Sequence, residues 1–213
     1  MSPNFPWKIL LFGRPVLQHD DGRTFDFPKY AYAVFVLLTF DRAGGSALRE
    51  DIAQFLWPRT ALEQQQSNLR TLLKRIRSTQ AAANMEIFVI ERQRISLHNN
   101  AAFSDIHEFR RLSRSASGLD LAAAAELIRG DLLEGCDQGP ASFEFWLQNH
   151  RSILINRLVA EACKLINNAA MASHPEAREA LALKLIELNP GEEKAYCALL
   201  SIYAARRDRK SVV

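Results

Sequence analysis

Residues 60–97 read TALEQQQSNLRTLLKRIRSTQAAANMEIFVIERQRISL, and their pattern predicts a helix followed by two short strands. Its first half predicts an amphipathic helix, because apolar side chains recur there at helical spacing: Leu69, Leu72, Leu73 and Ile76. Its second half contains two β-compatible runs, residues 87–90 and 95–97, with Arg92 and Arg94 between them. The two runs predict a β-hairpin with a basic tip.

The exposed face of the helix is the candidate binding surface. Thr60 and Glu63 form a capping-box pattern, so we expect the helix to begin there. Opposite the buried stripe, hydroxyls, an amide and cations are expected to share one face: Gln64, Ser67, Arg70, Thr71, Lys74, Arg75 and Ser78. Such side chains bond to the bases and phosphates of nucleic acids. A solvated surface helix is the alternative interpretation of these cations.

The sequence before residue 60 predicts a small sheet and two helices. Strand-like runs occupy residues 7–12, 15–18 and 23–27. The turn signal His19-Asp20-Asp21-Gly22 indicates that the last two runs are antiparallel neighbours. Residues 30–40 favour a buried helix, although their Val and Phe side chains also suit a strand. A further helix is expected from Ala47 to Trp57, ended by Pro58.

Composition excludes several classes of protein. The 213 residues are 48% hydrophobic and 24% charged, as in globular proteins, and the longest apolar run is too short for a membrane span. Three widely spaced cysteines predict neither a disulfide framework nor a metal site, and a reducing cytoplasm is expected. No phosphate-binding loop, zinc-protease pattern or nucleophile elbow occurs, so we expect no enzyme and no cofactor.

Charge and helical pattern differ between the two halves of the chain. Residues 1–100 contain 13 Lys or Arg and 9 Asp or Glu, a net charge of +4, whereas residues 101–213 have a net charge of −1. The second half predicts helices at residues 105–112, 121–128, 146–172, 175–188 and 192–205. Between them lie Gly130-Asp131-Leu132-Leu133-Glu134-Gly135 and the aromatic stretch Phe143-Glu144-Phe145-Trp146, for which core packing is favoured over a ligand pocket.

Strands, three helices and a closing hairpin describe a winged helix-turn-helix. The N-terminal part resembles the OmpR-type DNA-binding domain of SARP-class transcriptional activators. The matching motifs are Leu10-Leu11-Phe12-Gly13, Arg49-Glu50-Asp51-Ile52, Phe55-Leu56-Trp57-Pro58 and Asn68-Leu69-Arg70 with Leu73-Lys74-Arg75-Ile76-Arg77. The segment from Gly130 to Trp146 resembles the bacterial transcriptional activation domain of the same regulators. A tetratricopeptide-like helical hairpin is indicated by Ala180, Leu183, Ile186, Pro190, Ala195, Tyr196 and Tyr203.

This resemblance implies an α+β winged helix-turn-helix domain over residues 1–101 and an all-α, tetratricopeptide-like activation domain over residues 102–213. It implies a cytoplasmic DNA-binding transcriptional activator that reads the major groove with the helix at 61–79. Arg92 and Arg94 would enter the minor groove. The expected partners are double-stranded DNA, RNA polymerase and, through the C-terminal helices, a second copy of the chain.

Some residues depart from the family pattern. Leu48 stands where the family places a Ser, so Ser46 is expected to cap the second helix. The hairpin tip has no Gly, so a wider turn is expected there. The family's helical region continues further, which suggests a fragment or a short member. The alternative function is a protein-interaction module with a degenerate winged helix and a partner-binding helical repeat.

Overall fold

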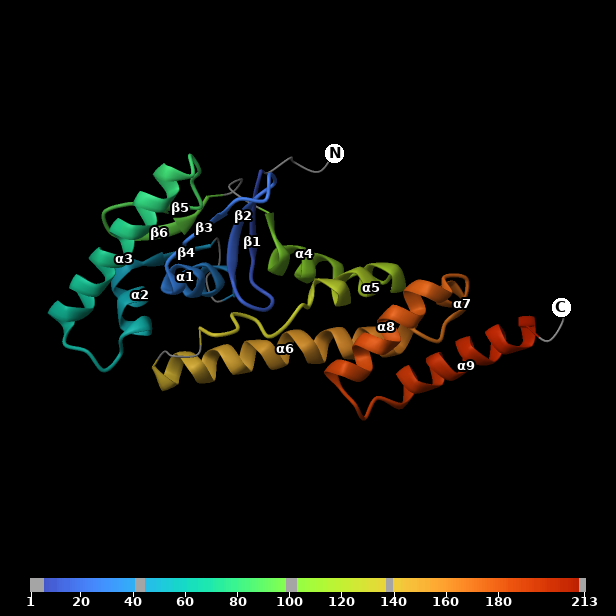
Figure 1. Ribbon diagram of the computed structural model, residues 1–213. Coiled ribbons are helices and arrows are strands. Elements are labelled where there is room, and N and C mark those ends of the chain that lie inside the picture. The colour runs from blue at the N-terminus through green and yellow to red at the C-terminus, as the bar shows by residue number, and fades with distance from the viewer. Residues whose placement is uncertain (1–5, 41–44, 99–102, 137–139, 211–213) are drawn as a thin grey trace. The chain divides into compact units, whose positions relative to one another are not determined.

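The computed structural model describes residues 6–40, 45–98, 103–136 and 140–210, and it combines α-helices with small β-sheets (Figure 1). The chain divides into two compact units. The first unit comprises Met1–His107 and Gly130–Asn149, and the second comprises Glu108–Arg129 and His150–Val213. The predicted domain boundary at residues 101 and 102 lies outside the described residues. The fold class is therefore confirmed in general terms: mixed α+β, with a helical C-terminal region.

The first unit contains seven short strands and three complete helices within its described residues. In chain order these are β1 (Trp7–Leu10), β2 (Val16–His19), β3 (Thr24–Phe25), α1 (Lys29–Phe40), β4 (Ser46–Leu48), α2 (Arg49–Leu56), α3 (Leu62–Ala82), β5 (Phe88–Ile90), β6 (Arg94–Leu97) and β7 (Phe103–Ser104). One sheet has the order β3-β2-β1-β7 and the other β4-β6-β5. Pairing is antiparallel except between β1 and β7.

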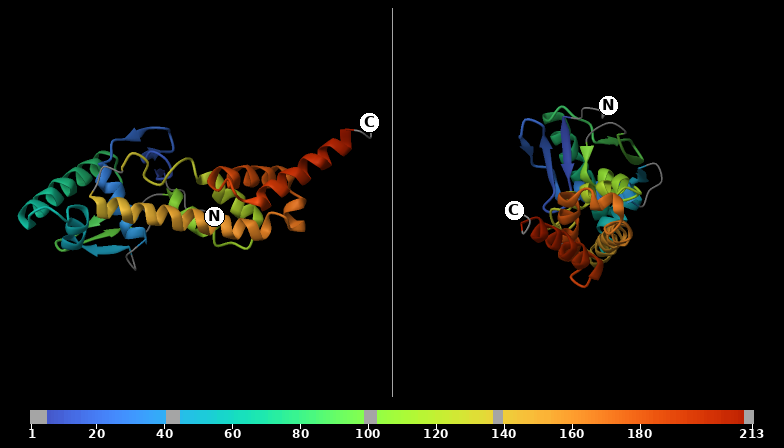
Figure 2. Two further views of the ribbon diagram at one scale, coloured as in Figure 1. Left: turned by 90° about the horizontal axis from the view of Figure 1, so that it is seen from below. Right: turned by 90° about the vertical axis from the view of Figure 1, so that its right-hand side faces the viewer.

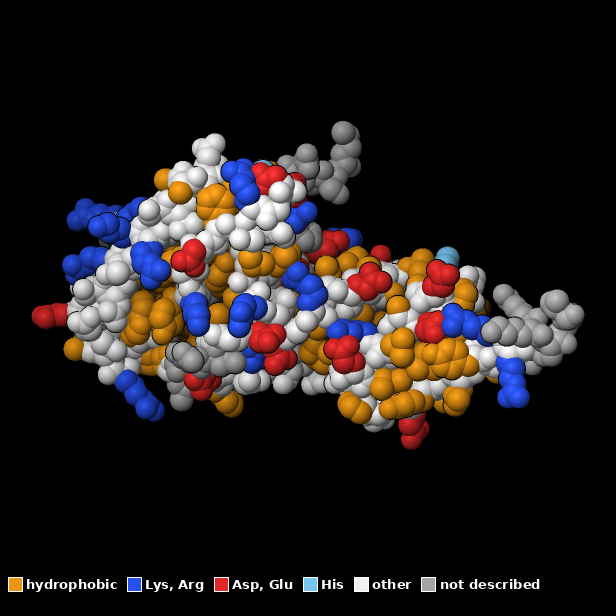
Figure 3. Space-filling model, in the orientation of Figure 1, with side chains coloured by type: hydrophobic (Ala, Val, Ile, Leu, Met, Phe, Trp, Pro, Cys, Tyr) orange, Lys and Arg blue, Asp and Glu red, His pale blue; other side chains and the backbone are white. Residues whose placement is uncertain are grey.

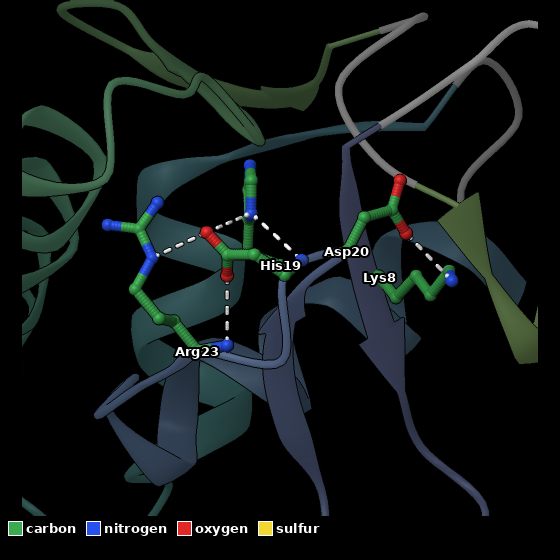
Figure 4. Close-up of polar contacts among 5 residues, drawn as sticks. Lys8, His19, Asp20 and Arg23 are labelled. Carbon is green, nitrogen blue, oxygen red and sulfur yellow. Dashed lines mark hydrogen bonds and ion pairs between the residues drawn. The ribbon is translucent and has the colours of Figure 1, made fainter.

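The predicted turn between β2 and β3 is confirmed. Gly22 adopts a positive φ of 89°, which side chains other than glycine rarely tolerate. The Asp21 carboxylate accepts hydrogen bonds from the Arg23 backbone N–H at 3.0 Å and from Arg23 Nε at 2.7 Å, and the backbone bond holds the pKa of Asp21 below its usual value. Beside the turn, Lys8 Nζ lies 2.7 Å from Asp20 Oδ1 (Figure 4).

Helix α1 is the centre of the first unit, because residues 31–38 are all buried. Burial on every side explains why its sequence shows no polar face and was ambiguous between helix and strand. Helix α3, by contrast, is amphipathic as predicted: Leu69, Leu72, Leu73 and Ile76 are each at most 6% exposed. Its far face is therefore left for solvent or a ligand.

The segment Gly130–Asn149 joins the first unit through contacts with the end of β1. The backbone N–H of Gly13 donates to the Asp131 carbonyl at 2.9 Å, and that of Leu133 donates to the Leu11 carbonyl at 2.8 Å. A Cβ atom at Gly130 would lie 3.0 Å from Gly13 Cα, so the close approach favours glycine. The motifs at residues 10–13 and 130–135 thus pair with each other, although they are far apart in sequence.

A buried carboxylate completes this junction. Asp105, 1% exposed, accepts hydrogen bonds from the backbone N–H of Leu11 at 2.9 and 2.8 Å and from that of Phe12 at 3.1 Å. Strand β7 delivers Asp105 to this position, because Ile9 pairs with Ser104 in parallel register. The carboxylate therefore ties the end of β1 to the start of α4 (Asp105–Leu112).

The described part of the second unit consists of helices. They are the second half of α4, α5 (Gly118–Leu127), the part of α6 (Ala141–Leu165) from His150 onward, α7 (Ala169–Ala172), α8 (Pro175–Leu188) and α9 (Glu193–Lys210). Helix α8 packs against α5 on one side and against α9 on the other. The predicted helix at 175–188 is confirmed with both its ends. Among the described residues, none of the helices is both long and apolar enough to cross a bilayer.

The second helix begins later than its sequence predicts. We expected it from Ala47, but Ser46–Leu48 form strand β4, in which Ala47 pairs with Ile95 of β6. Helix α2 then begins at Arg49, and its N-cap residue is Leu48, which provides no side-chain hydrogen bond. The prediction that Ser46 caps this helix is wrong. Ser46 Oγ instead accepts a hydrogen bond from Arg94 Nε at 3.1 Å.

The capping box at Thr60 and Glu63 is also wrong. Helix α3 begins at Leu62, so its N-cap residue is Ala61, and no side chain caps it. Gln65 stabilises the turn instead. This side chain is buried, and its Nε2 donates to the carbonyls of Trp57 and Thr60, both at 2.9 Å. The buried Gln65 amide thereby provides a donor for two backbone carbonyls. The predicted cap at Thr60 would have left these carbonyls to bond with solvent.

The hairpin turn is tight rather than wide. The backbone N–H of Glu91 donates to the Arg94 carbonyl at 3.0 Å, so only Arg92 and Gln93 form the tip. Among the described residues other than glycine, positive φ occurs at Asn84 and Leu133 alone. The turn therefore does not use the left-handed backbone conformation for which a glycine is needed.

The long helix predicted over residues 146–172 is divided in two. Helix α6 begins earlier, at Ala141, and ends at Leu165, and the short helix α7 follows. Asn168 separates them: its side-chain oxygen accepts a hydrogen bond from the Met171 backbone N–H at 2.8 Å and caps α7. The last helix, in contrast, extends beyond its predicted end at residue 205 to Lys210.

Candidate nucleic-acid interface

The exposed side of α3 carries the predicted polar and basic side chains. All seven candidate residues of this helix are exposed: Gln64, Ser67, Arg70, Thr71, Lys74, Arg75 and Ser78. Figure 3 shows Lys and Arg side chains gathered at the outer side of α3, at the left edge of the view. Because the apolar stripe holds the helix to its own unit, this surface, which we call the α3 ridge, is free to meet a ligand.

Two side-chain hydrogen bonds order the start of the α3 ridge. Thr71 Oγ1 donates to the Ser67 carbonyl at 3.1 Å, and Gln64 Nε2 donates to Asn68 Oδ1 at 2.8 Å. The Thr71 hydroxyl keeps its lone pairs as acceptors, and Gln64 keeps its amide oxygen. Together with the Lys74 ammonium, the ridge thus presents both donors and acceptors along one line.

A hollow of about 440 Å³ lies on one side of the α3 ridge. It is lined by the start of α2, by α3 and by the tip of the β5–β6 hairpin: Leu48, Arg49, Glu50, Ala53, Gln66, Leu69, Arg70, Leu73, Arg92 and Gln93. Among the described residues, Arg49, Arg70 and Arg92 thus face one space with a single carboxylate, Glu50. We call this space the hairpin-side hollow. Its lining favours an anion over a cation.

Arg49 is the most constrained cation of the hairpin-side hollow. Its Nη1 donates to the Arg92 carbonyl at 3.1 Å, and its Nε is buried without a hydrogen-bond partner among the described residues. Burial and the nearby charge of Arg77 lower the pKa of Arg49, yet an arginine stays charged at neutral pH. The positive charge of Arg49 would be stabilised by an anion in the hollow.

A second hollow, of about 630 Å³, lies on the opposite side of the α3 ridge. Its lining residues come from the start of α1, the end of α2 and α3: Asp26, Phe27, Pro28, Lys29, Tyr30, Trp57, Asn68, Thr71, Leu72 and Arg75. The rings of Tyr30 and Trp57 meet edge to face, with centroids 5.4 Å apart. Lys29 and Arg75 are its cations, and Asp26 is its carboxylate. We call this space the α1-side hollow.

The two hairpin arginines, predicted together at the tip, have different positions. Arg92 is one of the two tip residues and lines the hairpin-side hollow. Arg94 is the first residue of β6, opposite Leu48, and its Nε is bonded to Ser46 Oγ. Both side chains are exposed. Arg92 therefore shares a space with the α3 ridge, whereas Arg94 is held against strand β4.

Sequence reasoning missed three cations beside the α3 ridge. Arg49 and Lys29 lie at the starts of α2 and α1, and each is brought to a hollow by packing between elements. Arg77 lies next to the exposed face of α3 that carries the seven candidate residues. Its Nη2 donates to the Ile90 carbonyl at 3.4 Å. Only Arg77 had a signal in the sequence, because it belongs to the same basic stretch.

The aromatic stretch of α6 packs within the first unit rather than around a ligand. Phe143 is 1% exposed and stacks on Trp146, and both rings contact Phe55 of α2 with centroids 5.9 and 5.4 Å apart. Phe145, in contrast, is 78% exposed and takes no part. Phe143 and Trp146 therefore pack against α2 through Phe55. Arg49 is the first residue of the same helix.

In sequence comparisons, no protein-family model and no curated protein matches this chain.

Proposed function

We propose that this chain is a DNA-binding transcriptional regulator that inserts α3 into the major groove of duplex DNA. The observation that carries the proposal is the arrangement of the α3 ridge, with a cation-lined hollow on each side. A helix with its side chains is about 10–12 Å wide, and the major groove is about 12 Å wide. The phosphate backbones that border the groove would then meet the two hollows.

The cations suit this division of roles. Arg49 and Arg70 in the hairpin-side hollow would contact one phosphate backbone, and Arg92 at the hairpin tip would reach the adjacent minor groove. Lys29 and Arg75 in the α1-side hollow would contact the other backbone. The remaining ridge side chains, Ser67, Thr71 and Lys74, would face the base edges and read sequence.

The order of elements supports a winged helix-turn-helix of the OmpR type. Strand β4 lies between α1 and α2, and the hairpin β5–β6 follows α3 and pairs with β4. This order and the resemblance of both halves to SARP-class regulators favour a cytoplasmic activator, whose helical region contacts RNA polymerase. The hairpin would be the wing, lying along the minor groove beside the site.

The wing assignment gives a testable difference between two arginines. Arg92→Ala is expected to weaken DNA binding about 3- to 10-fold and to reduce the preference for A·T sequence beside the core site, because arginine is attracted to narrow minor grooves. Arg94→Ala is the matched control, because Arg94 is already bonded to Ser46. Affinities are measured by fluorescence anisotropy on duplexes with A·T-rich or G·C-rich flanks. Equal losses for both variants, or none for Arg92→Ala, would remove the wing from the proposal.

The proposal as a whole is tested by selection from a randomised duplex library. The native chain is expected to enrich one motif and to bind it about 10³-fold or more tightly than a scrambled duplex, as specific regulators do. A chain carrying Thr71→Ala is expected to enrich a motif altered at one position. If no DNA motif is enriched, and the purified chain brings down other proteins but no DNA, the chain is an interaction module with a degenerate winged helix.

A further inference from the structure

Helix α9 has an exposed apolar stripe. Its inner side is formed by Ala195, Ala198 and Ile202, all buried in the second unit. On its outer side Leu200 is 68% exposed, Tyr196 44% and Tyr203 46%. At 100° per residue these three side chains fall within about 60° of arc, centred about 130° away from the buried ones. Figure 3 shows hydrophobic side chains gathered over α8 and α9 on the face in view.

The charges along α9 run from acidic to basic. Glu192 precedes the helix, Glu193 and Lys194 begin it, and Arg206 and Arg207 stand near its end. Glu193, Leu200 and Arg207 are spaced by seven residues and therefore share the face of the exposed stripe. Arg206 forms an ion pair with Glu179 of α8, and its guanidinium lies over the Tyr203 ring, 5.9 Å from the ring centroid. In Figures 1 and 2 the final turn of α9 extends beyond α8. The Arg207 side chain is exposed.

The apolar and charged side chains on this face of α9 match those on a second copy of the helix that runs in the opposite direction. A two-fold axis at Leu200 that sets two copies of α9 antiparallel would place Leu200 against Leu200 of the second copy. The same operation would place Tyr196 beside the partner's Tyr203, and Glu193 beside the partner's Arg207. A parallel arrangement would instead bring Glu193 beside the partner's Glu193, and like charges at that distance repel.

We propose that α9 is a self-association surface, on which a second copy of this chain packs antiparallel through the stripe Tyr196, Leu200 and Tyr203. Isologous pairing of one patch with itself is the commonest way in which two identical chains associate. The occupant is a second copy because both the apolar spacing and the charge gradient match the same helix reversed. This inference does not depend on DNA binding, and it is tested without DNA.

Sedimentation equilibrium over a range of concentrations tests the surface. The apparent mass of the native chain is expected to rise with concentration from 24.1 kDa toward twice that value. Leu200→Asp is expected to weaken association about 100-fold or more, because it would bury two like charges at the axis. Leu183→Asp is the matched control: Leu183 is 52% exposed on α8, outside the stripe, so association is retained. Circular dichroism establishes that both variants keep their helices.

A charge exchange tests the orientation. Glu193→Arg and Arg207→Glu are each expected to weaken association, whereas the chain carrying both exchanges restores it, because each pair across the two-fold axis is again of opposite sign. Antiparallel packing alone gives this rescue. A single mass of 24.1 kDa for the native chain at every concentration would overturn the proposal. Association that is unchanged by Leu200→Asp, or loss without rescue in the double exchange, would overturn the surface or its antiparallel register.

Discussion

Replacing Lys74 and Arg75 together with alanine is expected to weaken duplex DNA binding by about 30-fold or more, with the fold unchanged. Both side chains are exposed on the α3 ridge, and neither lies on its buried stripe. If each contacts a base edge, each contributes about 1–3 kcal/mol of discrimination, so the loss falls mainly on the selected motif. If each contacts a phosphate, the loss is similar for all sequences. Anisotropy titrations on the selected and scrambled duplexes distinguish the two cases.

The control for this variant removes the same charge elsewhere. Lys164 and Lys194 are exposed on α6 and α9 in the second unit, so their double replacement with alanine lowers the net charge equally. It is expected to change affinity little, because general attraction to DNA is screened by salt. Equal affinity of the native and Lys74/Arg75 chains would exclude α3 as the recognition helix. If both double variants lose the same affinity for DNA, net charge alone accounts for the interaction.

Asp105→Ala is expected to lower the stability of the first unit by about 2–6 kcal/mol, a large part of what a domain of this size possesses. The substitution leaves the backbone N–H groups of Leu11 and Phe12 buried and without this acceptor, and each such group costs about 1–3 kcal/mol. All three tryptophans, Trp7, Trp57 and Trp146, belong to the first unit. Urea unfolding followed by their fluorescence therefore measures the stability of that unit.

Asp20→Ala is the matched control, because it also removes one carboxylate near β1. Asp20 is paired with Lys8 at the surface, where both side chains are at least 40% exposed, and such pairs contribute about 1 kcal/mol or less. If the Asp105→Ala and Asp20→Ala variants have the same midpoint of urea unfolding, the buried carboxylate does not hold β1 to α4.

The parts of the fold that could be predicted are those whose signal is local. The amphipathic spacing of Leu69, Leu73 and Ile76 predicted α3, and Pro175 marked the first residue of α8. Helix starts were less predictable, because strand pairing decided one of them. Ser46 has the chemistry of a helix cap, but its neighbours pair with β6, and the ladder of backbone hydrogen bonds displaces the cap.

Long-range junctions had no local signal. Nothing near Gly130 indicates that it approaches Gly13, nor does the sequence around Asp105 indicate that its carboxylate reaches the end of β1. The same holds for the candidate interface. Periodicity predicted the exposed face of α3, but the two hollows depend on how α1, α2 and the hairpin pack beside it. Arg49 and Lys29 therefore became candidates only once the packing was known.

The dependence of binding on salt concentration tests whether the cations beside α3 contact DNA phosphates. The affinity of the native chain for a random-sequence duplex is measured at a series of NaCl concentrations. If Arg49, Arg70, Lys29 and Arg75 neutralise four phosphates, log Kobs is expected to fall against log[NaCl] with a slope of about −4. The Lys74/Arg75 double variant should then give a slope closer to zero by about one, because Arg75 alone of the two is assigned to a phosphate. Binding by the native chain that stays near the detection limit, with no dependence on salt, would contradict the account.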